Sequence, residues 1–241
     1  MDKSVSIIIP AYNEEKKLAG AVNLVLEGLR KNGIIDFEIL IFDDASKDQT
    51  GEVADELAKK YPQVKVIHNV KNMNLGFNFI RGVELATKEF VGMLPGDNET
   101  DPETLDNIFS ALGQVDIVVP YLQNPETRPW MRRFLSKTYV AIINAAFGLN
   151  MKYYNGMCYF KTSMIKNVPV STFGFAYMTE ILVKMLKSNP TIKFIEVPLI
   201  NRVREKGASK AFRIKNVASV FKTFLTLFWE VQILRKRIKL E

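Results

Sequence analysis

The chain has 241 residues, of which 47% are hydrophobic, and this is enough to bury one substantial core. Cys158 is the only cysteine, which excludes an intrachain disulfide and gives no sign of an oxidising compartment. The first residues pass directly into a strand-like run without a basic and apolar leader. We therefore expect a protein that faces the cytoplasm.

The net charge of +7 is unevenly distributed. Residues 202–241 contain eleven Lys or Arg and three Glu, a net charge of +8, which leaves −1 for residues 1–201. A cationic end argues against a surface coated with nucleic acid and favours an anionic partner, such as lipid headgroups or a lipid phosphate. A basic tail that is merely solvated is the alternative.

Strand-like and helix-like segments alternate along the first half of the chain. Apolar runs predict strands at 5–10, 37–42, 64–68 and 90–94, and amphipathic runs predict helices at 13–33, 46–61, 78–87 and 102–112. Asn13 is a candidate cap for the first helix, and Ser46 with Gln49 matches a capping box for the second. This alternation indicates right-handed crossovers and a mainly parallel sheet that is covered by helices on both faces.

The second half of the chain continues the α/β pattern to about residue 212. We expect strands at 116–121, 157–161 and 192–197 and helices at 132–147 and 176–188. The polar segment 123–129 contains two prolines and is predicted to be a loop or lid. Because no convincing linker interrupts this region, residues 1–212 are predicted to form one nucleotide-binding domain.

Residues 213–241 have the pattern of a basic amphipathic helix. Bulky apolar residues recur at helical spacing between Val217 and Leu234, and Arg235-Lys236-Arg237 follows them. The segment is too polar to span a bilayer comfortably, so we expect it to lie at a membrane interface. There each basic residue near anionic lipid would add about 1 kcal/mol. Packing of this helix on the domain or on a second subunit is the alternative.

The turn after the predicted strand at 90–94 carries two carboxylates, Asp97 and Glu99. Pro95-Gly96 ends the strand, and Asp101-Pro102 supplies an N-cap followed by proline at the first helical position. In open α/β sheets the carboxyl ends of the strands are where ligands bind. Two carboxylates in one turn can share a hard divalent cation with phosphate oxygens and water. An ordinary acidic surface turn is the alternative when this segment is taken alone.

Several short motifs follow one another in a recognisable order over about residues 4–212. They are Ile9–Glu14, Asp43–Thr50, Asn74–Gly76 running to Arg81–Gly82, Gly96–Glu99, Arg132–Lys137, the Asn155–Gly156 turn and Arg204–Lys210. Together they resemble the family 2 glycosyltransferases with the GT-A fold. Within that family the likeness is to the polyprenyl-phosphate sugar synthases, such as the dolichyl-phosphate mannose synthases.

The resemblance implies a set of residues that bind a nucleoside-diphosphate sugar. A carboxylate at a strand end can accept a hydrogen bond from a base N–H or a ribose hydroxyl, and a tyrosine ring can cover the base. The residues assigned to the nucleotide sugar in this way are Pro10, Tyr12, Glu14, Asp43, Asp44, Arg81, Asp97 and Lys210.

The resemblance also implies a metal site. Asp97 matches the second aspartate of the family's D-x-D motif, and Glu99 stands where a polar metal ligand is usual. The sequence departs from the motif at Pro95, which replaces the first aspartate. The metal, Mg²⁺ or Mn²⁺, would then be held by Asp97 with Glu99.

Basic residues match the family's positions for the acceptor. Arg132 and Ser136 match residues that hold an acceptor phosphate, and Arg204, Ser209 and Lys210 match a distal basic loop. Arginine binds phosphate as a fork and lysine as a point charge, so both suit this role. One solvated face of a helix is the alternative for the basic residues of 132–137.

The reaction implied by these assignments is an inverting transfer of a sugar to a polyprenyl phosphate at the cytoplasmic face of a membrane. His68, the only histidine, lies in a predicted strand and is expected to be structural. A phosphate acceptor needs no general base, because it is ionised at neutral pH. Asp97, through its metal, would offset the charge of the departing diphosphate while Arg132 and Arg204 orient phosphates, and these three are the catalytic candidates.

Other readings remain open. A glycosyltransferase that acts on a hydroxyl acceptor would use Glu99 or Asp101 as its base. A non-catalytic nucleotide-sugar-binding protein is allowed by Pro95. A dinucleotide-dependent oxidoreductase is disfavoured, because no G-x-G-x-x-G follows the first strand. The sequence leaves open a membrane-protein partner or a homo-oligomer.

Overall fold

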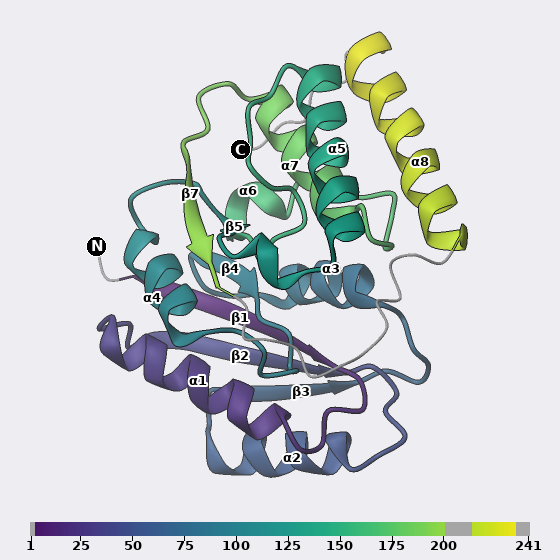
Figure 1. Ribbon diagram of the computed structural model, residues 1–241. Helices are drawn as coiled ribbons and strands as arrows, with labels where there is room; N and C mark the ends of the chain where they lie inside the picture. The colour runs from purple at the N-terminus through teal and green to yellow at the C-terminus, as the bar shows by residue number, and fades with distance from the viewer. Residues whose placement is uncertain (1–2, 201–213, 235–241) are drawn as a thin grey trace.

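The chain folds around a seven-stranded sheet with helices on both faces (Figure 1). The structure is a computed structural model that describes residues 3–200 and 214–234. The strands are β1 (Ser4–Ala11), β2 (Asp36–Asp43), β3 (Val64–His68), β4 (Phe90–Met93), β5 (Ile117–Leu122), β6 (Tyr159–Lys161) and β7 (Phe194–Leu199). The α-helices are α1 (Leu18–Lys31), α2 (Thr50–Lys60), α3 (Leu75–Leu85), α4 (Pro102–Ala111), α5 (Trp130–Phe147), α6 (Thr162–Ile165), α7 (Tyr177–Ser188) and α8 (Ile214–Phe228). A 3₁₀ turn at Pro125–Thr127 lies in the predicted loop, and a π-helical turn at Trp229–Ile233 continues α8.

The strand order is β3-β2-β1-β4-β6-β5-β7, which confirms the predicted, mainly parallel α/β sheet. β1 is parallel to both β2 and β4, β2 is parallel to β3, and β5 is parallel to β7. Only β6 runs antiparallel to its neighbours within the described sheet. Because β1, β2 and β4 run in one direction, the loops that follow them lie at the same edge of the sheet.

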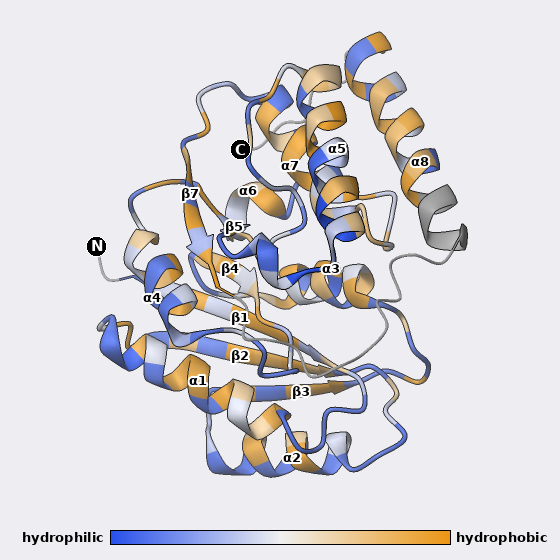
Figure 2. Ribbon diagram, viewed as in Figure 1, coloured by the Kyte–Doolittle hydropathy of each residue, from blue (hydrophilic) through white to orange (hydrophobic). Residues whose placement is uncertain are grey.

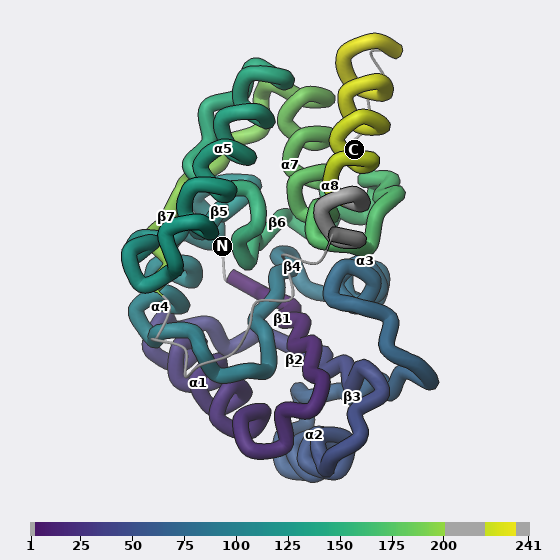
Figure 3. Tube along the Cα trace, turned by 45° about the vertical axis from the view of Figure 1, so that its right-hand side comes forward, coloured from purple at the N-terminus to yellow at the C-terminus, as the bar shows by residue number. Residues whose placement is uncertain are grey.

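Consecutive side chains of β1 enter two different cores. Ile7 and Ile9 pack with residues of α1, α2 and α4, whereas Ile8 packs with residues of α3 and α7, and all three are fully buried. Figures 1 and 3 show α1 and α4 on one side of the sheet and α3 on the other. Figure 2 shows the outer helices with alternating hydrophobic and hydrophilic residues. Burial on both faces explains why three isoleucines, Ile7 to Ile9, follow one another in β1 without a polar residue between them.

Two predicted helix starts are wrong. α1 begins at Leu18, five residues beyond Asn13, and Asn13 adopts a left-handed φ of 57° instead of capping it. α2 begins at Thr50, and the predicted capping box of Ser46 and Gln49 makes no capping hydrogen bond. The polar groups of these two loops bind each other instead, as described below.

The last described helix packs on the domain through one of its two apolar faces. Leu227 and Val231 are buried, and the ring of Phe147 at the end of α5 lies 6.2 Å from the rings of both Phe224 and Phe228. These residues belong to the same core as Ile8 of β1. In the part of the chain that the structure describes, no helix has the length and apolarity needed to cross a bilayer. The predicted membrane position of residues 213–241 stays a prediction.

The sheet leaves no room for a side chain at Gly92 of β4. A Cβ atom there would lie 2.3 Å from the ring of Tyr159, its buried partner on β6. We expect Gly92→Ala to lower the free energy of unfolding by roughly 1–3 kcal/mol, because the core must shift to relieve this contact. Urea denaturation measures the change.

Gly96→Ala is the matched control for this prediction, because the nearest atom to its new Cβ would be 3.2 Å away. We expect a smaller loss of stability from the control. Equal losses in the two variants would show that the β4–β6 contact is not the cause.

Candidate active site

The loops after β1 and β2 are joined by side chain to backbone hydrogen bonds. The backbone N–H of Asn13 donates to Ser46 Oγ at 3.1 Å, and the N–H of Lys47 donates back to Asn13 Oδ1 at 2.8 Å. The N–H of Glu14 donates to Thr50 Oγ1 at 2.7 Å. These bonds fix the loop that carries Tyr12 and Glu14 against the loop that carries the two aspartates of β2.

The two aspartates at the end of β2 have different partners. Asp43 accepts hydrogen bonds from the backbone N–H of Ser46 at 3.0 Å and is 3.1 Å from His68 Nδ1. Asp44 accepts from the backbone N–H of Met73 at 2.7 Å and of Asn74 at 3.1 Å. Asp44 therefore holds the loop that enters α3, while Asp43 is tied to β3 through His68.

Asp43 and His68 shift each other's pKa. Burial acts to raise the pKa of Asp43, but hydrogen bonds from Ser46 and His68 outweigh it and bring the pKa below the ordinary value. The hydrogen bond to Asp43 is the largest cause that raises the pKa of His68, and a second one to Asp55 adds to it. His68 links three elements of the fold, which agrees with the structural role expected for it.

The acidic turn after β4 lies at the same edge. Asp97 Oδ1 accepts a hydrogen bond from the backbone N–H of Glu99 at 3.2 Å. Asp101 caps α4 by accepting from the N–H of Glu103 at 3.0 Å, and Pro102 follows it, as predicted. Lys17 Nζ lies 3.8 Å from a carboxylate oxygen of Glu99 and 3.9 Å from one of Glu14, so it stands between the β1 loop and the acidic turn.

Asp97 and Glu99 fit a Mg²⁺ or Mn²⁺ ion that is shared with a substrate. Carboxylate oxygens are the hard donors that these ions accept, and one or two are enough where phosphate oxygens and water supply the remaining ligands. In the described ranges no group of three or more His, Cys, Asp or Glu is arranged to hold a metal ion by protein ligands alone. The donor set therefore suits an ion that arrives with a diphosphate.

A basic hollow of about 340 Å³ lies against α5. The predicted acceptor residues Arg132 and Ser136 line it together with Val140, at i, i+4 and i+8 of the helix. The other lining residues include four further cations and two polar side chains, which are Arg128, Arg133, Lys137, Lys152, Asn144 and Tyr153. Among the described residues that line the hollow, none is Asp, Glu or His. The hollow is therefore suited to an anion.

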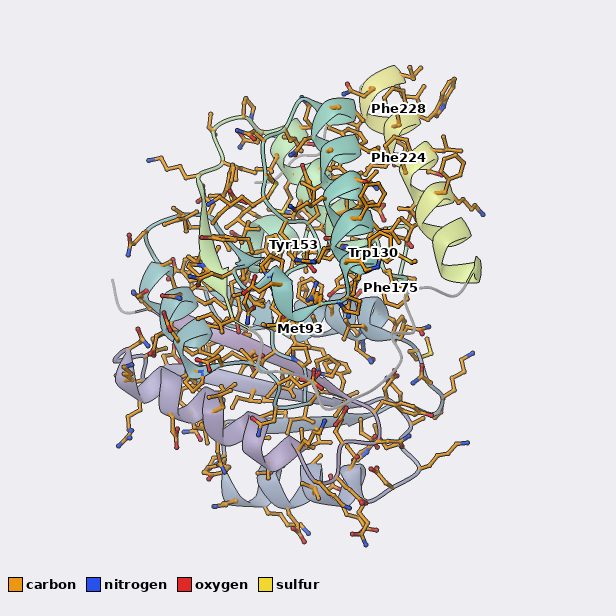
Figure 4. The ribbon with its side chains drawn as sticks, viewed as in Figure 1. Met93, Trp130, Tyr153, Phe175, Phe224 and Phe228 are labelled. Carbon is orange, nitrogen blue, oxygen red and sulfur yellow. The ribbon has the colours of Figure 1, made fainter. Side chains whose placement is uncertain are left out.

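The segment 152–157 joins the acidic turn to the hollow. At one end Thr100 Oγ1 donates to Met157 Sδ at 3.9 Å. At the other end Arg128 donates to the hydroxyl of Tyr153 at 3.4 Å, and Lys152 Nζ lies 4.2 Å from the centre of the Tyr121 ring. The predicted Asn155–Gly156 turn sits between these contacts. Figure 4 shows Tyr153 between the lower end of α5 and the sheet.

The structure brings most of the predicted residues to one region. Pro10, Tyr12, Glu14, Asp43, Asp44, Asp97 and Glu99 lie on the loops and strand ends just described. Arg81 is exposed on α3, and its guanidinium is 2.7 Å from Glu84 of the same helix. Arg204, Ser209 and Lys210 lie outside the described residues.

Three residues that line the hollow were not predicted as site residues from the sequence. Arg128 was assigned only to a loop, and Lys152 and Tyr153 were not singled out. Their only signal in the sequence is that they flank predicted motifs, because their contacts join residues more than twenty positions apart. Lys17 was likewise not predicted as a site residue, because it lies near the start of the helix predicted at 13–33.

Similar folds occur among solved structures of glycosyltransferases. Mannosyl-3-phosphoglycerate synthase from Rubrobacter xylanophilus aligns with a TM-score of 0.72 and 15% identity over 97% of this chain and 75% of that one. Glucosyl-3-phosphoglycerate synthase from Mycobacterium tuberculosis, in complex with Mn²⁺ and UDP-glucose, aligns with a TM-score of 0.68 and 14% identity over 95% of this chain and 78% of that one. At this identity the likeness shows the fold, which is the GT-A fold.

A sequence model described as glycosyl transferase family 2 matches residues 6–169. The chain therefore belongs to glycosyltransferase family 2, as the motifs predicted. It is 30% identical over 217 residues to a dolichol-phosphate mannosyltransferase of Pyrococcus furiosus. It is 28% identical over 215 residues to an undecaprenyl-phosphate 4-deoxy-4-formamido-L-arabinose transferase of Pectobacterium atrosepticum. Each match covers 86% of this chain but only 58% and 62% of the respective relative.

The raised pKa of His68 makes one contribution to stability depend on pH. That contribution is fully present below the unfolded pKa of about 6.5 and is lost as the pH rises through the higher pKa of the folded state. We expect the free energy of unfolding to fall between about pH 6 and 8 more steeply in the wild type than in His68→Gln.

The difference should be below about 1 kcal/mol, because the His68 side chain is nearly half exposed. Urea denaturation at several pH values measures it. His68 is the only histidine, so its substitution removes all histidine titration. Other titrating groups are present in both proteins and therefore cancel in the comparison. Identical slopes for the two proteins would contradict the ionic pairing of His68 with Asp43 and Asp55.

Proposed function

We propose that this glycosyltransferase moves a sugar from a nucleoside-diphosphate sugar to a polyprenyl phosphate, with inversion at the anomeric carbon and with Mg²⁺ or Mn²⁺. The observation that carries the proposal is the basic hollow on α5, whose described lining contains five cations and no carboxylate or histidine. The names of the two relatives, a dolichol-phosphate and an undecaprenyl-phosphate sugar transferase, support the same class of acceptor.

The chemistry of the hollow favours a phosphate over a hydroxyl acceptor. A sugar or lipid hydroxyl must lose a proton as it attacks, so a general base has to stand beside it. The hollow offers no such base among its described residues, and Asp101 already caps α4. A phosphate monoester arrives ionised, and Arg132 can hold it by two parallel hydrogen bonds while Ser136 donates a third.

The donor would bind at the edge formed by the loops after β1, β2 and β4. Tyr12 would cover the base, while the carboxylates of Glu14 and Asp44 would accept from base N–H or ribose hydroxyl groups. Asp97 and Glu99 would hold the divalent ion, which would offset negative charge on the leaving diphosphate. Segment 152–157 would keep the donor and the acceptor phosphate in fixed relative positions for attack from the opposite face of the sugar.

A location at the cytoplasmic face of a membrane fits this acceptor. A polyprenyl chain keeps its phosphate at a bilayer surface, so the enzyme must work there. The helix at 214–234 presents apolar residues on a second face, and the cations at 235–237 follow it in the sequence. Peripheral association by this helix is part of the proposal.

Removal of the carboxylate of Asp97 tests the metal site. We expect Asp97→Ala to lower the transfer rate by at least about a hundredfold, because charge on the leaving diphosphate is no longer offset. The fold should persist, since Asp97 contributes one turn hydrogen bond. Glu103→Ala, an exposed position in the first turn of α4, is the control and should keep near wild-type turnover.

The assay follows radiolabelled sugar from a panel of nucleotide sugars into a mild-acid-labile lipid product, with Mn²⁺ or Mg²⁺ present. Retained turnover in Asp97→Ala would remove the metal assignment. Binding of a nucleotide sugar without transfer or hydrolysis in the wild type would favour a non-catalytic binding protein.

A substitution in the hollow should change the kinetic constants for the acceptor and leave those for the donor nearly unchanged. Arg132→Ala should lower kcat/KM for the polyprenyl phosphate by about tenfold to a hundredfold, because a charged hydrogen bond to phosphate is lost. Its effect on the KM for the nucleotide sugar should be small. Arg30→Ala, on α1 at the other face of the sheet, is the matched control. Transfer to a hydroxyl acceptor that is insensitive to Arg132→Ala would contradict the phosphate site.

A further inference from the structure

Asn155 is an exposed polar residue in the segment that joins the acidic turn to the hollow, and Gly156 and Met157 after it are buried. β6 runs antiparallel to β4 and pairs Tyr159 with Gly92. The residues that precede Tyr159 therefore extend toward the same edge of the sheet as the residues that follow Gly92. Asn155 thus lies at the edge that carries the acidic turn, with its side chain open to solvent.

The backbone on both sides of Asn155 is held in place. A Cβ atom at Gly156 would lie 2.3 Å from the carbonyl oxygen of Pro120, so the chain passes directly against β5 there. On the other side, the hydroxyl of Tyr154 donates to Asn144 Oδ1 at 2.5 Å. The backbone of Asn155 is therefore positioned by the fold and does not need a ligand to order it.

The side chain of Asn155 is held by two hydroxyl groups in series. The hydroxyl of Tyr139 on α5 donates to Thr179 Oγ1 on α7 at 2.8 Å, and Thr179 donates in turn to Asn155 Oδ1 at 3.3 Å. Thr179 is only 2% exposed. Burial raises the pKa of Tyr139 to about 12, so its hydroxyl keeps the proton that it donates. These three residues are called the Asn155 relay below.

The direction of the relay decides which end of the Asn155 amide is left for a ligand. Because the Tyr139 hydroxyl donates to Thr179, the hydroxyl of Thr179 is left to donate its own proton to a further acceptor. In an asparagine side chain only the oxygen accepts, so Oδ1 faces Thr179 and the amide nitrogen Nδ2 faces away from it. In the described part of the chain no group accepts a hydrogen bond from Nδ2. The relay therefore presents a hydrogen-bond donor to the site.

Asn155 lies between the two sides of the proposed site. Two residues after it, Met157 contacts Thr100 beside the acidic turn, and two residues before it, Tyr153 contacts Arg128 of the hollow. In an in-line transfer the sugar lies between the leaving diphosphate and the attacking group. The amide of Asn155 is therefore at the level of the sugar, between the places of the two phosphates.

We propose that Asn155 Nδ2 donates a hydrogen bond to a hydroxyl oxygen of the transferred sugar, and that Tyr139 and Thr179 are positioning residues for it. The assignment rests on the proposed function for the places of donor and acceptor. A neutral amide suits this position, because a carboxylate would repel the phosphates on either side. A fixed donor also selects among sugars, since a sugar that lacks the matching hydroxyl leaves the donor unpaired.

Binding of nucleotides with and without a sugar tests the contact. The probes are GDP-mannose, UDP-glucose, UDP-N-acetylglucosamine, GDP and UDP with Mn²⁺, and calorimetry on the full chain measures each Kd. We expect Asn155→Ala to weaken the sugar nucleotide by about threefold to tenfold, because one neutral hydrogen bond is lost. The Kd of the matching nucleoside diphosphate should change by less than about twofold, since it has no sugar to contact Asn155.

Asn150→Ala is the matched control, because Asn150 is an exposed asparagine of the same loop. It should leave both dissociation constants unchanged. Equal weakening of the sugar nucleotide and the nucleoside diphosphate by Asn155→Ala would overturn the proposal. An unchanged Kd for the sugar nucleotide, or a wild type that binds none of the sugar nucleotides, would overturn it as well.

Donor analogues that each lack one sugar hydroxyl identify the atom that Asn155 contacts. One analogue should bind more weakly than the parent to the wild type but about equally to Asn155→Ala, because analogue and variant remove the same hydrogen bond. The remaining analogues should lose the same factor in both proteins. If every analogue lost the same factor in both, no sugar hydroxyl would be the partner of Asn155.

Two substitutions at Thr179 test the relay. Valine resembles threonine in shape but cannot donate to Asn155 Oδ1, so Thr179→Val should weaken the sugar nucleotide by about twofold to fivefold. Thr179→Ser keeps the hydroxyl and should keep the wild-type Kd. Thr179→Val also leaves the Tyr139 hydroxyl without its acceptor and should lower the Tm. A lower Tm with a wild-type Kd would show that the relay only joins α5 to α7, and would overturn its positioning role.

The result for Asn155 is separable from the result for the acceptor. Calorimetry uses no acceptor, so a failure of transfer to polyprenyl phosphate would count against the proposed function and leave the effect of Asn155→Ala on nucleotide binding as measured. If Asn155→Ala raised only the KM for polyprenyl phosphate and left the Kd of the sugar nucleotide unchanged, the amide would belong to the acceptor site and the proposal would be wrong.

Discussion

The parallel register of β1 with β2 and β4 is the constraint on which the site depends. Ala11 pairs with Asp43 at the ends of β1 and β2, and Ile8 pairs with Met93 near the end of β4. The three loops that follow must share one edge, and their polar groups satisfy one another, as Asn13 and Ser46 do. Each such hydrogen bond contributes about 0.5–1.5 kcal/mol, and together they hold the loops after β1 and β2 against each other.

Charge is separated across this edge. The side proposed for the donor carries carboxylates, with Lys17 between Glu14 and Glu99, whereas the hollow on α5 is lined by cations. In the proposed function a divalent ion would have its ligands on the first side, and an anionic acceptor would have its ligands on the second. Residues 127–179 contain no Asp or Glu and include most of the residues that line the hollow, so an anionic acceptor would meet no carboxylate from that stretch as it approaches.

The sequence predicted features that depend on neighbours along the chain. The apolar run of β1 and the Asp101-Pro102 start of α4 are examples, because burial pattern and cap are local signals. The cap assigned to Asn13 was wrong because its partner Lys47 lies 34 residues away. Arg128 and Tyr153 were missed at the hollow for the same reason. The tail pattern left membrane contact and packing as alternatives, and the helix has one apolar face buried and another exposed.

Segment 152–157 contacts both the acidic turn after β4 and the hollow on α5, so the fold fixes the position of one relative to the other. Attack on the sugar demands that the reacting atoms be held about 3–3.5 Å apart in line, so independent movement of donor and acceptor sites would be costly. At Gly156 a Cβ atom would lie 2.3 Å from the carbonyl oxygen of Pro120 on β5, so the segment lies directly against the sheet. With Met157 bound by Thr100 and Tyr153 by Arg128, a displacement of the acidic turn must either move the hollow or break one of these contacts.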